Sequence, residues 1–259
     1  MANHTRVYHE KPNYQTILDA VTKQFHSGEG AIQFAPEAIA RSNADILNKD
    51  DLKNEFIEIY TEQGKEEAKK WIDLTYGPFT KEELDHRLTR YGLNPCGEIL
   101  GNDFHCNLAE VHLNQINPND IEEQNKAFKA AALSVACLLN HEFDVERYRK
   151  SREFDPIVGV SFTGLFDFFV HAFGTPWLKW WESGRPETEE GKDFKKKEAK
   201  YLNSWRMTVN QTVWEYCDKH NLRRPNRCTT VQPAGTKSLL TGAAPGWHPP
   251  KAQRFIRRI

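Results

Sequence analysis

Two cysteines lie ten residues apart in the stretch YGLNPCGEILGNDFHCNL. The first, Cys96, stands two positions after Asn94 and two positions before Glu98. Pro95 and Gly97 disfavour a regular helix, so the segment predicts a loop that presents the sulfur rather than burying it. If the segment is extended, residues two apart point the same way, and the amide, the thiol and the carboxylate converge on one spot.

The carboxylate next to this sulfur limits the chemistry that the group can perform. Glu98 adds like charge and so disfavours the thiolate form of Cys96. A neutral thiol that gives up a hydrogen atom fits the group better than a thiolate nucleophile does, with Glu98 as an acid or base beside it. The alternative is an ordinary cysteine in a turn, and spacing alone does not separate the two interpretations.

Zinc binding is a second alternative for this stretch, because His105 stands next to Cys106. A structural zinc site normally needs another close pair of ligands, and the other cysteines lie at unrelated spacings. We therefore assign no metal ligands. Cys137 and Cys217 fall within expected amphipathic helices, where we predict core positions. Cys228 opens a short strand, where we predict a structural role.

A second cluster with chemical potential is the sequence QPAGTKSLLTG. Glycine lets a backbone approach a ligand closely, and hydroxyl groups, backbone N–H groups and a lysine can together bind phosphate. The spacing is not that of a P-loop, and a solvated turn is the alternative. The candidate phosphate-binding residues are Pro233, Ala234, Gly235, Thr236, Lys237 and Ser238.

The elements that must position these clusters follow from hydrophobic spacing and capping residues. Helices are expected over 13–25, 35–47, 50–72, 80–91 and 118–139, and again around 202–216. Strands are expected in AEVHLNQI and at the start of DPIVGVSFTGLFDFFVHAF, where Gly164 turns the chain into an aromatic helix. The charged stretch at 177–197 predicts an exposed insertion. Helices alternating with short apolar strands indicate an α/β fold.

Bulk composition excludes some classes of partner. Lys and Arg number 35 against 36 for Asp and Glu, so net charge gives no case for nucleic acid or a membrane surface. No apolar run is long enough to span a bilayer, and the N-terminus has no signal-peptide core. The odd count of five cysteines indicates reduced thiols. A cytoplasmic location is the expectation.

Taken together, the motifs resemble one family. NPCGEI, CNL, GVSFTGLFDF and QPAGTKS followed by GAAPGWHPP occur in the order found in catalytic domains of ribonucleotide reductase large subunits. SGEGAIQFAPEAIARSNADIL and GNDFHCNLAEVHLN are most similar to the adenosylcobalamin-dependent (class II) ribonucleoside-triphosphate reductases. The resemblance implies a ten-stranded α/β barrel with the radical cysteine on an internal finger loop. Residues 1–259 would be the central part of this barrel, incomplete at both ends.

The resemblance also implies a role for each matched residue. Cys96 matches the cysteine that becomes a thiyl radical and abstracts the 3′ hydrogen of the ribose. Glu98 matches the acid/base at the ribose hydroxyls, and Asn94 matches the amide that holds them. Cys106 matches one half of the redox pair that reduces the 2′ position, and residues 233–238 match the loop that grips the substrate phosphates. The implied cofactor is adenosylcobalamin, which carries the radical step.

Departures from the family pattern concern the redox partners. The second redox cysteine is expected upstream of this chain, and the cysteines that re-reduce the site are expected beyond Ile259. We therefore expect a complementing polypeptide, together with a thioredoxin-like or other dithiol reductant and a ribonucleotide substrate. Two alternatives stay open: a fragment of a class I large subunit, and a nucleotide-binding relative that is catalytically incomplete.

Overall fold

The computed structural model describes residues 4–28, 30–250 and 252. It is a mixed α/β chain that divides into two compact units. Unit 1 runs to His105 and also includes residues 143–155, whereas unit 2 comprises Cys106–Glu142 and the chain from Pro156 onward. This mixture confirms the expected α/β class, although each sheet in the described residues pairs only two strands.

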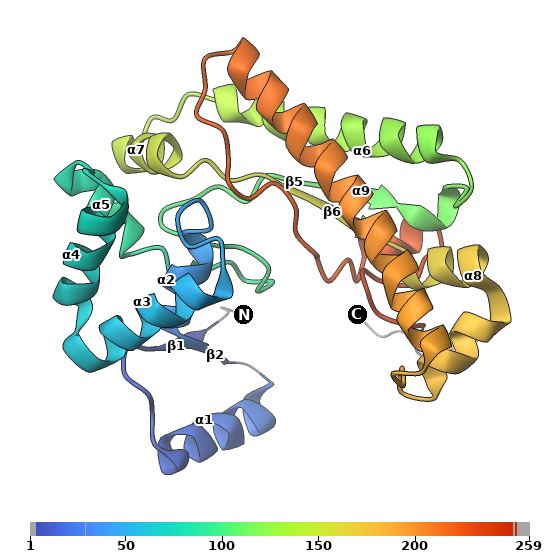
Figure 1. The fold of residues 1–259 in the computed structure, drawn as a ribbon, viewed down its shortest axis with the longest axis horizontal. Coiled ribbons are helices and arrows are strands. Elements are labelled where there is room, and N and C mark those ends of the chain that lie inside the picture. The colour runs from blue at the N-terminus through green and yellow to red at the C-terminus, as the bar shows by residue number, and fades with distance from the viewer. Residues whose placement is uncertain (1–3, 29, 251, 253–259) are drawn as a thin grey trace. The chain divides into compact units, whose positions relative to one another are not determined.

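Unit 1 is mostly helical and contains two small sheets (Figure 1). Strands β1 and β2, which helix α1 connects in the sequence, pair directly in parallel. Strands β3 and β4 form a short antiparallel hairpin. The elements are β1 (Thr5–Tyr8), α1 (Tyr14–Ser27), β2 (Ala31–Phe34), α2 (Ala35–Ser42), α3 (Asp50–Gln63), α4 (Lys65–Tyr76), α5 (Lys81–Arg87), β3 (Gly92–Leu93), β4 (Leu100–Gly101) and α7 (Glu146–Phe154).

The core of unit 1 lies among the helices α2 to α5. Phe56 of α3, Ile72 of α4 and Leu88 just after α5 are fully buried in one apolar cluster. Two helices of unit 1 begin at residues whose side chains cap them. The Asn13 side chain accepts a hydrogen bond from Thr16 N at the start of α1. At the start of α5, the Thr80 hydroxyl accepts from Glu83 N. Helix α5 therefore starts at a fixed point just before the hairpin.

Unit 2 is built on a parallel strand pair, which α6 and α9 cross (Figure 1). Residues Leu108 to His112 pair in register with Gly159 to Thr163, and a single bridge from Val160 to Thr229 adds a third chain segment. The elements are β5 (Leu108–His112), η1 (Leu113–Gln115), α6 (Ile121–Ala136), η2 (Cys137–Asn140), β6 (Gly159–Thr163), α8 (Leu165–Glu182), α9 (Glu189–Lys219) and η3 (Lys237–Leu240).

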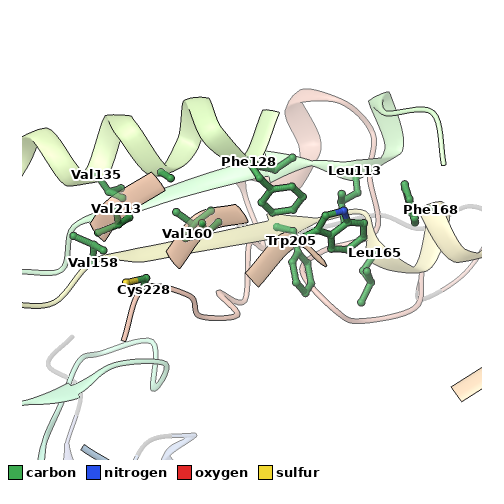
Figure 2. Close-up of a cluster of buried hydrophobic side chains, with 14 of the residues drawn as sticks. Leu113, Phe128, Val135, Val158, Val160, Leu165, Phe168, Trp205, Val213 and Cys228 are labelled. Atoms are coloured by element: carbon green, nitrogen blue, oxygen red, sulfur yellow. The ribbon is translucent and has the colours of Figure 1, made fainter. Parts of the chain in front are cut away.

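One face of this strand pair is apolar. Figure 2 shows Phe128 and Val135 of α6 pointing toward the strands, with Trp205 of α9 beside Phe128. The Phe128 and Trp205 rings stack with centroids 5.1 Å apart. The Trp205 indole N–H donates to Gln124 Oε1 at 3.0 Å, which satisfies its one polar atom. Alternation along the strands leaves their opposite face for polar residues.

Several of the expected elements differ from the observed ones. The helix predicted over 35–47 ends at Ser42. The helix predicted over 50–72 is two helices, because Gly64 has φ 92° between them. The helix begun at Thr80 ends at Arg87, short of the expected end. The stretch 177–197 is no exposed insertion: it completes α8 and starts α9, and both Trp177 and Trp180 are buried.

Cys137 corrects another expectation. It was predicted to lie in the core, but it follows the last turn of α6 and is exposed. Its thiol hydrogen-bonds to Ser134 O at 3.1 Å, a contact within its own helix. Cys217 and Cys228 are buried as predicted. Among the described residues, no helix combines the length and the apolar character needed to cross a bilayer.

Candidate functional site

Cys96 lies in the turn of the β3–β4 hairpin. Asn94 N donates to Ile99 O at 3.2 Å, and Gly97 N donates to Asn94 O at 2.9 Å. Gly97 has φ 79°, in the left-handed region that glycine enters without steric cost. The Asn94 side chain closes the same turn, because its Oδ1 accepts from both Glu98 N and Ile99 N at 3.0 Å. The turn is thus fixed by one buried amide.

The hairpin turn presents the sulfur as predicted, but not through an extended backbone. Cys96 is exposed, Asn94 is 8% exposed and Glu98 is half-buried. Because residues 94–97 turn back on themselves, the alternation of an extended strand does not apply to them. Asn94, Cys96 and Glu98 are therefore brought into one loop by a tight turn rather than by a shared strand face.

A chain of buried hydrogen bonds supports the end of this hairpin. Arg90 Nε donates to His86 Nδ1 at 3.1 Å, and since arginine only donates, this nitrogen carries no proton. His86 Nε2 therefore holds the proton and donates to Ser151 Oγ at 2.9 Å. The Ser151 hydroxyl in turn donates to the carbonyl oxygen of Asn102. Asn102 directly follows β4, so this series of hydrogen bonds joins α5 and α7 to the base of the β3–β4 hairpin.

The electrostatic surroundings keep His86 neutral. Its side chain belongs to a residue only 8% exposed. Burial, and next the positive charge of Arg90, lower the pKa of His86 to about 4, while Asp155 opposes this shift. Arg90 itself is fully buried and bonds Asn43 Oδ1 and Phe154 O, so it stays in place beside the imidazole.

Arg87 anchors the other side of α5. Its guanidinium bonds both carboxylate oxygens of Asp45, at 3.1 and 2.8 Å, and Glu83 at 3.0 Å. Burial would raise the pKa of Asp45, but the hydrogen bond and charge of Arg87 outweigh it and lower that pKa. Helix α5 is thereby held by ionic contacts that the sequence motifs did not reveal.

Cys106 and the loop 233–238 belong to unit 2. Cys106 is exposed and lies just before β5. The two buried cysteines are poor thiol partners, because burial raises the pKa of Cys217 to about 11 and that of Cys228 to about 12. No group of three or more His, Cys, Asp or Glu side chains in the described part of the chain is arranged to hold a metal ion.

The loop 233–238 covers the polar face of β5 and β6. Ser161 of β6 accepts from Gln232 N at 2.9 Å through its hydroxyl, and Thr163 Oγ1 accepts from Gly246 N at 3.0 Å. On β5, His112 Nδ1 contacts Thr241 Oγ1 at 2.7 Å. These contacts fasten the segment on both flanks of the loop to the two strands. Ligands of α/β proteins commonly bind beyond the carboxyl ends of parallel strands, which is where β5 and β6 lead.

Within the loop, the exposed groups are the ones that can bind an anion. Thr236 and Lys237 are exposed, whereas Ala234 and Ser238 are buried. Ala234 has φ 50°, a conformation that turns the backbone sharply before Gly235. Ser238 N donates to Ala234 O at 3.1 Å and closes this turn. The helix expected after the loop is the short 3₁₀ turn η3.

Comparison with known proteins agrees with the family that the sequence motifs resemble. The chain is 30% identical over 178 residues to an adenosylcobalamin-dependent ribonucleoside-triphosphate reductase of Levilactobacillus brevis, and 31% identical over 176 residues to one of Lactobacillus gasseri. The chain is similar to class II ribonucleotide reductases. Each match covers 65% of this chain, which confirms the resemblance that the motifs indicate.

The extent of the similarity is uneven. This chain spans 23% of the length of each of those two bacterial reductases. A probable adenosylcobalamin-dependent ribonucleoside-triphosphate reductase of Dictyostelium discoideum is 27% identical over 193 residues, which are 73% of this chain and 22% of that protein. A crystal structure of a B12-dependent (class II) ribonucleotide reductase matches 62% of this chain at 25% identity, with a TM-score of 0.46. No family model matches the chain.

Sequence reasoning missed the residues that hold the two clusters in place. His86, Ser151 and Glu110 were not singled out, although His86 and Glu110 lie within elements that were expected; Ser151 lies in α7, which was not expected. Glu110 and His112 alternate with Val111 along β5, so a polar strand face was visible in the sequence as a period of two. No comparable local signal marks His86, because its partner lies 65 positions away.

Proposed function

We propose that this chain, as part of a longer or complemented polypeptide, reduces ribonucleoside triphosphates to 2′-deoxyribonucleotides by thiyl-radical chemistry. The observation that carries the proposal is the exposed Cys96 in a turn locked by Asn94. The similarity to reductases that are about three times as long as this chain supports the chemistry and the need for further sequence.

Cys96 acts first in this scheme. Its S–H bond loses a hydrogen atom, and the resulting sulfur radical takes the hydrogen atom from C3′ of the ribose. The exposed sulfur fits a bulky radical source that must reach it from outside the loop. When bound, adenosylcobalamin supplies the one-electron chemistry that removes this hydrogen atom. Cys96 is the residue of this chain that faces that chemistry.

Glu98 and Asn94 manage the protons and the orientation of the sugar. The Glu98 carboxylate accepts the proton of the 3′ hydroxyl, while the 2′ hydroxyl takes a proton from one of the two redox thiols and leaves as water. The Oδ1 atom of Asn94 is used by the turn, so its Nδ2 group is the donor that would bind a ribose hydroxyl. A dual role of this kind makes Asn94 both a structural and a substrate-binding residue.

Cys106 supplies reducing equivalents. Two thiols give two electrons and two protons as they form a disulfide, and Cys96 finally returns its hydrogen atom to C3′. Cys106 is one of these thiols in our scheme. The family pattern implies that the second lies outside residues 1–259, because none of Cys137, Cys217 and Cys228 stands where that pattern has it. Cys217 and Cys228 are also buried with raised pKa values. An external dithiol protein, such as a thioredoxin-like reductant, then reduces the disulfide.

The loop 233–238 binds the substrate phosphates. Lys237 contributes positive charge, and the exposed Thr236 hydroxyl contributes a donor. In the same proposal, β5 and β6 are two strands of the ten-stranded barrel, and the hairpin turn at 94–99 is its finger loop. Residues 1–259 then form the central part of one catalytic barrel.

Electron paramagnetic resonance tests the radical assignment. The chain is mixed anaerobically with adenosylcobalamin, a ribonucleoside triphosphate and dithiothreitol, and the coupled thiyl–cobalt(II) signal is recorded. We expect the signal in the wild-type chain and in the buried-cysteine control Cys228→Ser, and its loss in Cys96→Ser. Equal signals from wild type and Cys96→Ser would show that Cys96 is not the radical residue.

Turnover separates the remaining alternatives. If the chain binds nucleotide but gives no radical signal and no deoxyribonucleotide product, with or without a complementing polypeptide, it is a nucleotide-binding relative without catalytic activity. Sustained turnover by the chain alone would refute the need for a complementing polypeptide. Dependence on a separate radical-generating subunit in place of the cobalamin would favour the class I alternative.

A further inference from the structure

Glu110 presents an unusual arrangement on the polar face of β5. Its side chain is only 3% exposed, yet neither carboxylate oxygen accepts a hydrogen bond within the described residues. The Lys237 ammonium lies 3.4 Å from Glu110 Oε2. A buried carboxylate with one nearby cation and no hydrogen bond needs an explanation, because burying an ion costs free energy unless the ion is well paired.

Gln232 holds the same lysine from a second side. Its side-chain Oε1 accepts a hydrogen bond from the Lys237 ammonium. Its Nε2 group is buried and has no partner among the described residues. Gln232 is itself fixed by its backbone N–H, which donates to the Ser161 hydroxyl of β6. Register pairs Ser161 with Glu110, so both side chains belong to the same face of the strand pair.

The Lys237 side chain is partly exposed to solvent, while its ammonium contacts the buried pair Glu110 and Gln232. The exposed fraction of this side chain is 49%. It stands in the middle of the candidate phosphate loop. An anion bound there would meet an ammonium whose charge is already balanced by the carboxylate beside it.

We propose that Glu110 balances the positive charge of the Lys237 ammonium at the sheet and thereby weakens anion binding at the loop 233–238. The inference rests on the phosphate role proposed above for this loop. Gln232 keeps the ammonium in place when Glu110 is neutral, so loss of the negative charge leaves the lysine positioned but no longer balanced.

Binding of inorganic tripolyphosphate tests the proposal. Glu110→Gln keeps the shape of the side chain and an oxygen acceptor for Lys237, but it removes the charge. We expect calorimetry to show tighter binding to this variant than to wild type, on the order of tenfold, because one nearby negative charge no longer repels the anion. Glu62→Gln, an exposed residue of α3 in unit 1, controls for the same change in net charge.

The outcomes of the binding experiment are distinct. Tighter binding by Glu110→Gln alone supports the inference, and unchanged or weaker binding overturns it while leaving phosphate binding by the loop intact. If wild type, Glu110→Gln and Glu62→Gln all fail to bind tripolyphosphate, the proposed role of the loop fails instead. Binding that persists in Lys237→Met would place the anion elsewhere.

A stability cycle tests the ion pair independently of any ligand. Lys237→Met leaves the buried carboxylate without its cation, so we expect a lower urea midpoint than for Lys237→Arg, which keeps the charge. Glu110→Gln added to Lys237→Met should recover most of that loss. A Lys237→Met chain as stable as wild type would refute the pairing, even if Glu110→Gln on its own proves insoluble.

Discussion

The buried imidazole of His86 predicts that unit 1 loses stability in mild acid. Burial and the charge of Arg90 lower the pKa of His86 from 6.5 to about 4. Between these two values, the unfolded chain binds a proton that the folded chain does not bind. The free energy of unfolding therefore rises with pH in this window. The stabilising contribution of neutral His86 is fully present above pH 6.5 and is lost as the pH drops toward 4.

The linkage relation sets the size of this effect. For a pKa of 6.5 unfolded and about 4 folded, the contribution of His86 falls by about 2 kcal/mol between pH 8 and pH 5. Protonation would also place an N–H of His86 against the Arg90 N–H that now donates to it. We therefore expect the loss to be concentrated in α5 and the hairpin stem.

The assay is urea unfolding at several pH values from 5 to 8, with hydrogen exchange followed on peptides from residues 81–102. His86→Gln keeps a polar side chain but removes the titrating ring, so the variant should lose about 2 kcal/mol of the pH dependence. His171→Gln, at an exposed position of α8, serves as the matched control. Identical pH slopes for wild type and His86→Gln would refute the reasoning, as would a His86 NMR titration midpoint near 6.5.

Three further predictions concern packing and thiol reactivity. Trp205→Ala should destabilise unit 2 by about 3–5 kcal/mol, measured by urea unfolding, because it removes a buried ring stacked on Phe128 and its hydrogen bond; a loss below about 1 kcal/mol would contradict this packing. Arg87→Met should cost about 2–3 kcal/mol, since it removes the guanidinium that pairs with the partly buried Asp45 carboxylate, and the cost should shrink as Asp45 is protonated in acid. In a labelling time course at pH 8, Cys217 and Cys228 should react with a maleimide only on unfolding, because burial raises both thiol pKa values; rapid native labelling of either would show an opening that the structure does not contain.

Local sequence rules predicted a good part of the fold. Thr80 and Asp120 cap their helices through side-chain acceptors, as their residue types indicate. Gly164 ends β6 and begins α8 in the left-handed conformation. Pro95 and Gly97 produce an exposed turn that carries Cys96. Each of these outcomes depends on neighbours within a few positions, so composition and spacing suffice to predict them.

Other features required the tertiary fold. The charged stretch at 177–197 was expected to be exposed, but Trp177 at its start is buried. The Trp177 indole N–H donates at 2.7 Å to the carboxylate of Glu198, a buried residue just after the stretch. Cys137 was expected in the core, yet the helix face that it occupies is turned to solvent. Amphipathic spacing shows that a helix has a buried face, but its partners decide how wide that face is.

The sequence by itself determined which groups are available for chemistry: a sulfur presented on a loop between an amide and a carboxylate, and a glycine-containing loop with a lysine. Only the tertiary structure decided which buried groups support them. His86 meets Ser151 across 65 positions, and Glu110 meets Lys237 because two parallel strands share a polar face. Contacts of this kind depend on strand register and helix packing, which no local pattern encodes.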